Sequence, residues 1–329
     1  KDQGAQKMIL DLRGNPGGLL SEAINVTNIF IPEGELITST KSAVEKYNQT
    51  FFTTRKAIDS EIPLAVLING RSASASEIVA GALQDLDRAV VIGARSFGKG
   101  LVQRPKDLTY GTQLKVTISR YYTPSGRCIQ ALDYQNRDEE GNAVRFTQKD
   151  YQEFKTRNGR KVYDGGGISP DIKLETSEYS SITNAILQQN AIFDYATKYY
   201  YSHKVPSPEA LELSDTDFRE FKKFLASTNF EYQTFTEKQL AEVKKAAQLE
   251  GFDDEIDGDF ADIEKTLEIS KQQAIEDKKQ EITSILADEI IKRYFYKEGL
   301  YEYYVENNPE IQKAKMVLND PAEYSKILK

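Results

Sequence analysis

The chain has 329 residues, of which 39% are hydrophobic and 29% charged, and its formal net charge is −8. This length suits two domains better than one, the acidic balance argues against a nucleic-acid-binding protein, and no stretch approaches the roughly 20 consecutive apolar residues of a membrane-spanning helix. A single cysteine, Cys128, and a single histidine, His203, exclude an internal disulfide, a cysteine-cluster zinc site and a site built from several histidines.

The first half of the chain alternates predicted strands and helices. Short apolar runs predict buried strands at 8–12, 64–68 and 89–92. Apolar residues at helical spacing predict helices over 19–30 and 76–86. Further on, Leu114, Val116 and Ile118 alternate with polar residues, which is typical of a half-buried strand. The recurring order of strand, turn, helix and strand indicates an α/β class.

Composition changes near residue 176, which predicts a domain boundary. Residues 1–175 carry a net charge of +3 and residues 176–329 a net charge of −11. We therefore predict a first domain over 1–178, with a polar insertion at about 131–167, and a second domain over 179–329. Helical patterns in the second domain cover 182–201, 236–250 and 263–296.

A serine-rich run lies between a predicted strand and a predicted helix. It reads Ser72-Ala73-Ser74-Ala75-Ser76-Glu77. A serine at such a junction can present its hydroxyl beside the free N–H groups of a helix N-terminus, which can stabilise an oxyanion. On spacing alone, Ser74-x-x-Glu77 is also a capping box, and most such pairs only cap a helix.

A glycine-rich segment follows the predicted strand at 89–92. Residues 93–100 match the phosphate-binding pattern G-x-x-x-x-G-K, but Gly100 stands where a magnesium-binding hydroxyl is needed. Pro105 would also break a helix starting there. These two defects argue against a nucleotide-binding loop and leave Lys99 for another role.

A serine nucleophile needs a base, and the choice here is narrow. His203 lies about 130 positions from Ser74, in the helical half. Lysine is the remaining base, as in known serine–lysine dyads. We expect the glycines around Lys99 to let the backbone pack closely and bury its amine, because burial favours the neutral form that can accept a proton.

Five motifs in this order resemble the C-terminal processing, or tail-specific, protease family over about residues 5–175. They are Arg13-Gly14-Asn15-Pro16-Gly17-Gly18, the serine-rich run, Phe97-Gly98-Lys99-Gly100-x-Val102-Gln103, Tyr122-Thr123-Pro124-Ser125-Gly126-Arg127, and Gly166-Gly167-Ile168-x-Pro170-Asp171. The resemblance implies that Ser74 is the nucleophile, Lys99 the base and Gln103 the residue that orients the lysine. It also implies an oxyanion hole from the N–H of Ala75 and a glycine N–H of the first motif, for which we choose Gly17, with Gly18 as the alternative.

The same resemblance implies an α/β protease core of the crotonase-like, ClpP-like spiral type, followed by an all-α C-terminal domain. We expect no PDZ domain and an incomplete front of the core in residues 1–329. The implied activity is that of a serine endopeptidase, which cleaves protein or peptide substrates at or near exposed C-terminal tails through an acyl-enzyme. It requires neither metal nor other cofactor.

The family implies a bacterial periplasmic or envelope location, and the aromatic helices of the acidic half are compatible with a homodimer. The alternative is a catalytically silent, truncated relative that acts as an interaction protein.

One acidic segment matches the spacing of a calcium-binding loop. It runs from Asp253 through Glu255, Asp257 and Gly258 to Glu264. Glu255 stands where Asp or Asn is usual, and the loop is single. We therefore interpret the segment as an acidic connection between helices.

Overall fold

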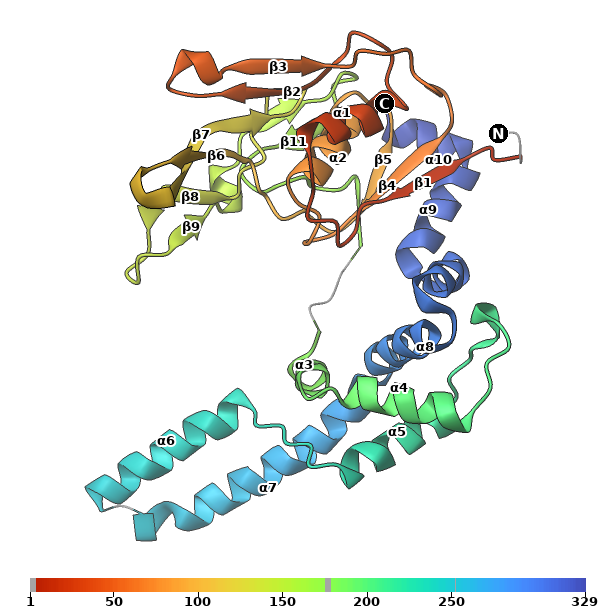
Figure 1. Cartoon of the computed structure of the whole chain (residues 1–329). Helices are drawn as coiled ribbons and strands as arrows, with labels where there is room; N and C mark the ends of the chain where they lie inside the picture. Colours follow the sequence, from red (N-terminus) through yellow and green to blue (C-terminus); the bar gives the residue numbers. More distant parts are fainter. Residues whose placement is uncertain (1–3, 175–178, 252) are drawn as a thin grey trace. The chain divides into compact units, whose positions relative to one another are not determined.

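A computed structural model describes residues 4–174, 179–251 and 253–329 (Figure 1). The chain divides into two compact units. Lys1–Thr176 together with Pro309–Lys329 form the first unit, and Ser177–Asn308 form the second. The first unit is mixed α/β and the second is helical, as the order of predicted elements indicates.

A four-stranded parallel sheet forms the centre of the first unit. Its order is β1 (Met8–Asp11), β4 (Leu64–Ile68), β5 (Val90–Gly93) and β12 (Ile172–Lys173). All five residues of β4 are buried, which explains its unbroken apolar run, because a central parallel strand is covered on both faces.

Helices cover both faces of this sheet. On one face, Leu64, Val66 and Ile68 join a core with residues of α1 (Leu20–Asn28) and α2 (Ala75–Asp85). On the other face, Ala65 and Leu67 pack with residues of α9 (Pro309–Asn319), close to α10 (Pro321–Ile327). In Figure 1 these two blue helices lie beside β4 and β5.

The position of α9 and α10 corrects the predicted second domain at its C-terminal end. Residues 309–329 are predicted to belong to the helical domain, whereas the structure groups them with the first unit. The physical reason is the second face of β4, whose apolar side chains need a cover. The Tyr324 hydroxyl of α10 also donates a hydrogen bond to the Leu64 carbonyl at 3.2 Å.

A second, antiparallel sheet completes the first unit. Its order is β3 (Gln49–Phe52), β2 (Leu36–Lys41), β7 (Gln113–Tyr122) and β6 (Leu101–Asp107). The alternating strand predicted at Leu114–Ile118 lies within β7. The polar segment 131–167 forms two small hairpins, made of β8 (Leu132–Arg137) with β9 (Ala143–Arg145) and β10 (Glu153–Lys155) with β11 (Lys161–Tyr163).

The second unit consists of six α-helices in the described part of the chain. They are α3 (Ser181–Gln188), α4 (Ala191–Ser202), α5 (Asp215–Ser227), α6 (Phe235–Glu250), α7 (Asp253–Asp277) and α8 (Lys279–Asn307). Ile186, Phe221 and Ile282 are fully buried in their common core. No helix in the described ranges is long and apolar enough to cross a membrane. The pattern predicted as one helical stretch at 263–296 is divided between α7 and α8.

The acidic segment 253–264 is not a connection between helices. It forms the beginning of α7, with helical backbone from Asp253 onward. The open loop backbone that a calcium-binding loop requires is therefore replaced by regular helix.

Candidate active site

Ser74 occupies a sharp turn between β4 and α2. It is the N-cap of α2 and has φ 56° and ψ −115°, a region that side chains rarely adopt. The other two serines of the run are buried. Ser72 donates its hydroxyl to the Leu12 carbonyl at 2.7 Å, and Ser76 donates to the Asn15 carbonyl at 3.1 Å. Ser74 is the one serine of the run that is partly exposed.

The glycine turn after β1 lies directly against this serine. The Ala73 N–H donates to the Asn15 carbonyl at 3.0 Å. A Cβ at Gly17 would lie 2.6 Å from the Ala73 oxygen and 2.8 Å from the Ala75 nitrogen. Only glycine fits at this position, where φ is also +100°. A Cβ at Gly18 would meet nothing within 4 Å, so Gly17 makes the close approach.

The backbone N–H of Gly17 already has an acceptor. It donates to the Asn15 side-chain oxygen at 2.9 Å. The N–H of Gly18 has no acceptor in the part of the chain that the structure describes. The structure therefore places the Gly17 backbone beside Ser74 but leaves Gly18 with the free N–H.

Glu77 forms hydrogen bonds both to the turn that carries Ser74 and to the loop that carries Lys99. One oxygen of its buried carboxylate, Oε2, accepts the N–H of Ser74 at 2.8 Å and the N–H of Lys99 at 2.9 Å. Because both nitrogens touch the same oxygen, they are less than about 6 Å apart. The backbones of the two predicted catalytic residues are therefore neighbours.

The second oxygen of the same carboxylate also accepts two hydrogen bonds. Oε1 of Glu77 accepts the Ser96 hydroxyl at 2.5 Å and the Gly98 N–H at 2.7 Å. Burial raises the pKa of Glu77, while the hydrogen bonds from Ser96, Lys99, Gly98 and Ser74 act in the opposite direction. The helix-cap role predicted for Glu77 accounts for its bond to Ser74 but not for its bonds to Ser96, Gly98 and Lys99.

The lysine loop packs closely along its backbone but exposes its side chain. A Cβ at Gly98 would lie 2.2 Å from the Ala131 side chain, and one at Gly100 would lie 2.7 Å from the Gln130 nitrogen. Lys99, between them, is exposed. The expectation of a buried Lys99 amine is therefore wrong for this structure, because the close packing involves the loop backbone and not the lysine side chain.

The structure of the segment after Lys99 also differs from that of a nucleotide-binding loop. Residues from Leu101 onward form strand β6, whereas the phosphate-binding pattern requires a helix there. Gln103 lies on this strand, is exposed, and donates from Nε2 to the Thr117 hydroxyl at 3.3 Å. No hydrogen bond joins Gln103 to Lys99 among the residues described.

His203 lies in the helical unit, where it follows α4. Its ring stacks on Tyr199 with the ring centroids 3.9 Å apart. Across the described ranges, no group of three or more histidine, cysteine or acidic side chains is placed to hold a metal ion.

Comparisons with known proteins agree with the motif resemblance. Residues 1–136 match the family "Peptidase family S41", and residues 182–318 match "Probable PDZ-protease, C-terminal helical domain". A "Carboxy-terminal-processing protease" of Bartonella bacilliformis is 51% identical over 124 residues, which are 38% of this chain and 28% of that protein. These matches confirm the resemblance drawn from the five motifs.

Two further matches are more distant. A "Probable CtpA-like serine protease" of Staphylococcus epidermidis is 29% identical over 248 residues, 74% of this chain and 46% of that protein. A solved structure titled "Photosystem II D1 C-terminal processing protease" is 31% identical in sequence. The match covers 53% of this chain and 36% of that protein's chain, with a TM-score of 0.40. The chain spans less than half the length of the two curated relatives named here.

Proposed function

Since this chain combines a peptidase family S41 region with a C-terminal helical domain of the PDZ-protease type, we propose that it is a serine endopeptidase acting through Ser74 and Lys99. The observation that carries this proposal is the shared carboxylate oxygen of Glu77, which holds the two backbones together while the Ser74 hydroxyl stays reachable. A serine without a neighbouring histidine needs another base, and Lys99 is the amine at hand.

In the proposed reaction, the Ser74 hydroxyl oxygen attacks the substrate carbonyl and its proton passes to the neutral amine of Lys99. The protonated lysine then gives the proton to the leaving amine, and water hydrolyses the resulting acyl-enzyme. The tetrahedral oxyanion would accept hydrogen bonds from the Ala75 N–H at the start of α2 and from a glycine N–H. That second donor is Gly17, once Asn15 releases it, or Gly18.

Gln103 has the orienting role in this proposal. Its Nε2 is occupied by Thr117, while its Oε1 has no donor within the described residues. An amide oxygen in that state can accept an N–H from the Lys99 amine and leave the nitrogen lone pair directed at the serine. This role requires the exposed lysine side chain to turn toward Ser74 when substrate binds.

The proposed substrates are proteins or peptides with exposed C-terminal tails. The name of the Bartonella relative supports this specificity, because it describes carboxy-terminal processing. We also propose a bacterial periplasmic or envelope location and a homodimer, which rest on the family resemblance and on the aromatic helices. A silent interaction protein remains the competing function, and labelling of the serine separates the two.

A fluorophosphonate should label this protein once, at Ser74. The expected product is identified by mass spectrometry of the peptide that spans Ser72, Ser74 and Ser76. Of these three serines only Ser74 is partly exposed, and its backbone lies close to that of the candidate base Lys99, so modification of one of the buried serines would contradict the site. Absence of labelling in the folded protein would favour the silent relative.

Gly17→Ala should abolish both labelling and hydrolysis, whereas Gly18→Ala should retain most of each. The new Cβ at position 17 would collide with backbone atoms on either side of Ser74, and the positive φ adds strain. At position 18 the space is open. The comparison uses turnover of an unfolded protein at a temperature where both variants are folded by circular dichroism. Equal activity of the two variants would refute the close approach.

A further inference from the structure

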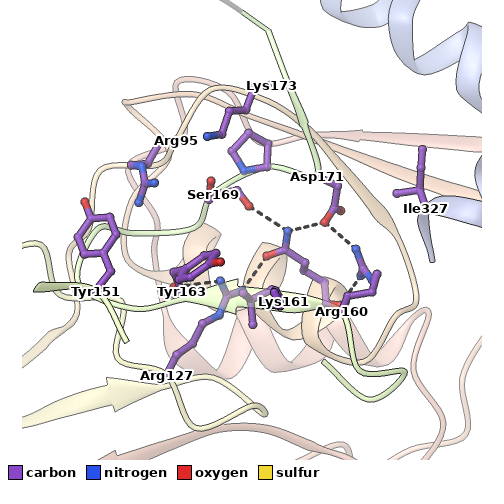
Figure 2. Close-up of a pocket in the computed structure, with 13 residues that line it drawn as sticks. Arg95, Arg127, Tyr151, Arg160, Lys161, Tyr163, Ser169, Asp171, Lys173 and Ile327 are labelled. Atoms are coloured by element: carbon purple, nitrogen blue, oxygen red, sulfur yellow. Dashed lines mark hydrogen bonds and ion pairs between the residues drawn. The ribbon is translucent and has the colours of Figure 1, made fainter. Parts of the chain in front are cut away.

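A cavity lies in the first unit, and none of the residues proposed for catalysis lines it. It has a volume of about 520 Å³ (Figure 2). Its lining includes five cationic side chains and one carboxylate, namely Arg95, Arg127, Arg160, Lys161, Lys173 and Asp171. All five cationic side chains belong to residues 1–175, which carry a net charge of +3.

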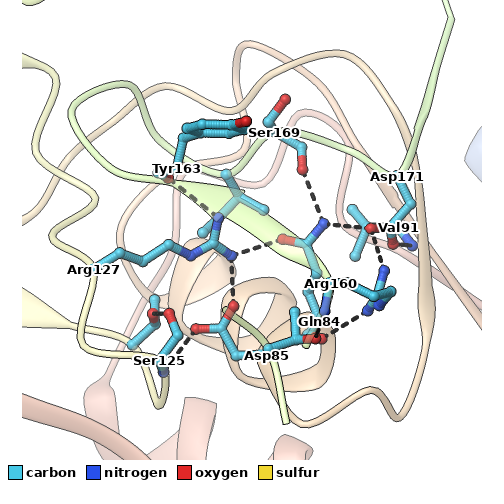
Figure 3. Close-up of polar contacts among 12 residues, drawn as sticks. Gln84, Asp85, Val91, Ser125, Arg127, Arg160, Tyr163, Ser169 and Asp171 are labelled. Atoms are coloured by element: carbon cyan, nitrogen blue, oxygen red, sulfur yellow. Dashed lines mark hydrogen bonds and ion pairs between the residues drawn. The ribbon is translucent and has the colours of Figure 1, made fainter. Parts of the chain in front are cut away.

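Two of the guanidinium groups are neutralised within the protein and form structural pairs. Arg127 is buried and donates to Asp85 at 2.8 Å and to Gln84 at 2.7 Å (Figure 3). Arg160 donates to Asp87 and to Asp171, both at 2.6 Å. Their charges are therefore already compensated, and their role in the cavity is to keep its wall rigid.

Lys161 is also compensated, because its amine lies 2.9 Å from the Glu153 carboxylate. The remaining cations are Arg95 and Lys173, and neither has a carboxylate partner in the described part of the chain. Arg95 lies over the Tyr151 ring, 5.1 Å from its centroid, and donates one N–H to the Gly166 carbonyl at 3.2 Å. That single bond leaves further guanidinium N–H groups of Arg95 without an acceptor.

The cavity lining also offers hydroxyl groups. Figure 2 shows Ser169 beside Arg95 and Lys173 on one side of the cavity, with Asp171 and Arg160 on the other. The Ser169 hydroxyl and the Tyr163 hydroxyl have no hydrogen-bond partner within residues 4–174, 179–251 and 253–329. Two uncompensated cations and two free hydroxyls, together in one concave site, are suited to a negatively charged ligand with several acceptor oxygens.

We propose that this cavity binds a small oxyanion, a carboxylate or a phosphate, held by Arg95 and Lys173 with a hydrogen bond from Ser169. Arg95 would supply paired N–H donors to two oxygens, and Lys173 would act as a point charge. The ligand could come free, as phosphate, or as the terminal carboxylate of a peptide, and the chemistry of the site is the same for both. The proposal does not depend on peptidase activity.

The test is a titration of the full chain with inorganic phosphate by isothermal calorimetry, at constant ionic strength maintained with chloride. We expect saturable binding at one site and a rise in melting temperature that grows with phosphate concentration. Arg95→Gln and Lys173→Gln should each weaken binding about tenfold or more, because each removes a charged partner of the anion. Both positions lack buried ion pairs, so the variants should fold.

The matched control is Lys106→Gln, which removes the same charge from an exposed position on β6, outside the cavity. Its phosphate affinity should equal that of the unaltered chain. Absence of saturable binding would overturn the proposal, and so would equal weakening by all three substitutions, which would indicate nonspecific charge attraction. A short peptide with a free C-terminus, compared with its amide, then shows whether the carboxylate source also binds.

Discussion

Ser74→Ala should lower the rate of peptide hydrolysis by a factor on the order of 10⁴ or more, and Lys99→Ala should cause a loss of similar size. The first substitution removes the attacking oxygen and the second removes its proton acceptor, so neither loss can be made up by tighter substrate binding. Both residues lie at the surface of a turn or loop, and circular dichroism and melting temperature should therefore stay close to those of the unaltered protein. The measurement is turnover of an unfolded protein substrate.

A charge-preserving variant gives this prediction its second readout. In the proposed dyad, the base must be a neutral amine that can accept the serine proton. Lys99→Arg keeps the positive charge but remains protonated, and it should be as inactive as Lys99→Ala. The control is Lys106→Ala, which removes an exposed lysine of β6 and should keep full activity. Wild-type turnover in any Ser74 or Lys99 variant would contradict the dyad.

Glu77→Gln should reduce turnover by about 100-fold or more and lower the free energy of unfolding by about 2–5 kcal/mol. The four N–H and O–H groups now bound to the carboxylate would face an amide whose NH₂ group cannot accept hydrogen bonds. Loss of the shared oxygen would separate the backbones of Ser74 and Lys99. Glu61→Gln removes an equal charge from an exposed site, and it should change neither quantity.

A purely structural role for Glu77 would affect stability without slowing the chemistry of the folded enzyme. The rate of fluorophosphonate labelling at a temperature well below melting therefore decides the question. We expect it to fall in Glu77→Gln and to be unchanged in Glu61→Gln. A normal labelling rate in a folded Glu77→Gln protein would refute its positioning role.

The buried carboxylate of Glu77 also predicts how activity changes as the pH is lowered. Because burial raises the pKa of Glu77, this group takes up a proton at a higher pH than an exposed glutamate does. A group whose pKa is raised in the folded state binds its proton more tightly there, so its contribution to stability is largest at low pH and declines as pH rises through the folded pKa. On acidification, activity should therefore fall through loss of an acceptor before unfolding begins.

Sequence reasoning predicted the elements whose patterns are purely local. The run Leu64–Ile68 has the unbroken apolar pattern of a strand covered on both sides, and Leu114–Ile118 has the alternation of a half-covered one. Both are strands in the structure, but Leu114 and Val116 are exposed, so the half-burial predicted for the second strand is wrong there. The order of five motifs was enough to indicate the family. These features depend on neighbours within a few residues, which a single sequence displays.

What the sequence could not show depends on partners far along the chain. Glu77 sits at the spacing of a helix cap, and nothing near it reveals that Ser96, Gly98 and Lys99 supply its other donors. Likewise, the glycines that flank Lys99 indicate close backbone packing but not the direction of the lysine side chain. The two C-terminal helices have amphipathic patterns that fit either unit, and only the uncovered face of β4 decides between them.

The return of α9 and α10 to the parallel sheet has a consequence for chain connectivity. Both ends of the helical unit, at residues 177 and 308, continue into segments of the same α/β unit. The helical unit is therefore inserted between two segments of the α/β unit. A single proteolytic cut among those helices would not free the C-terminal tail, which stays held by its packing on β4. Removal of residues 309–329, in contrast, would uncover Ala65 and Leu67 on the strand that leads directly to Ser74. We therefore expect loss of the last helices to disturb the turn that carries Ser74, although more than 230 residues of sequence separate them.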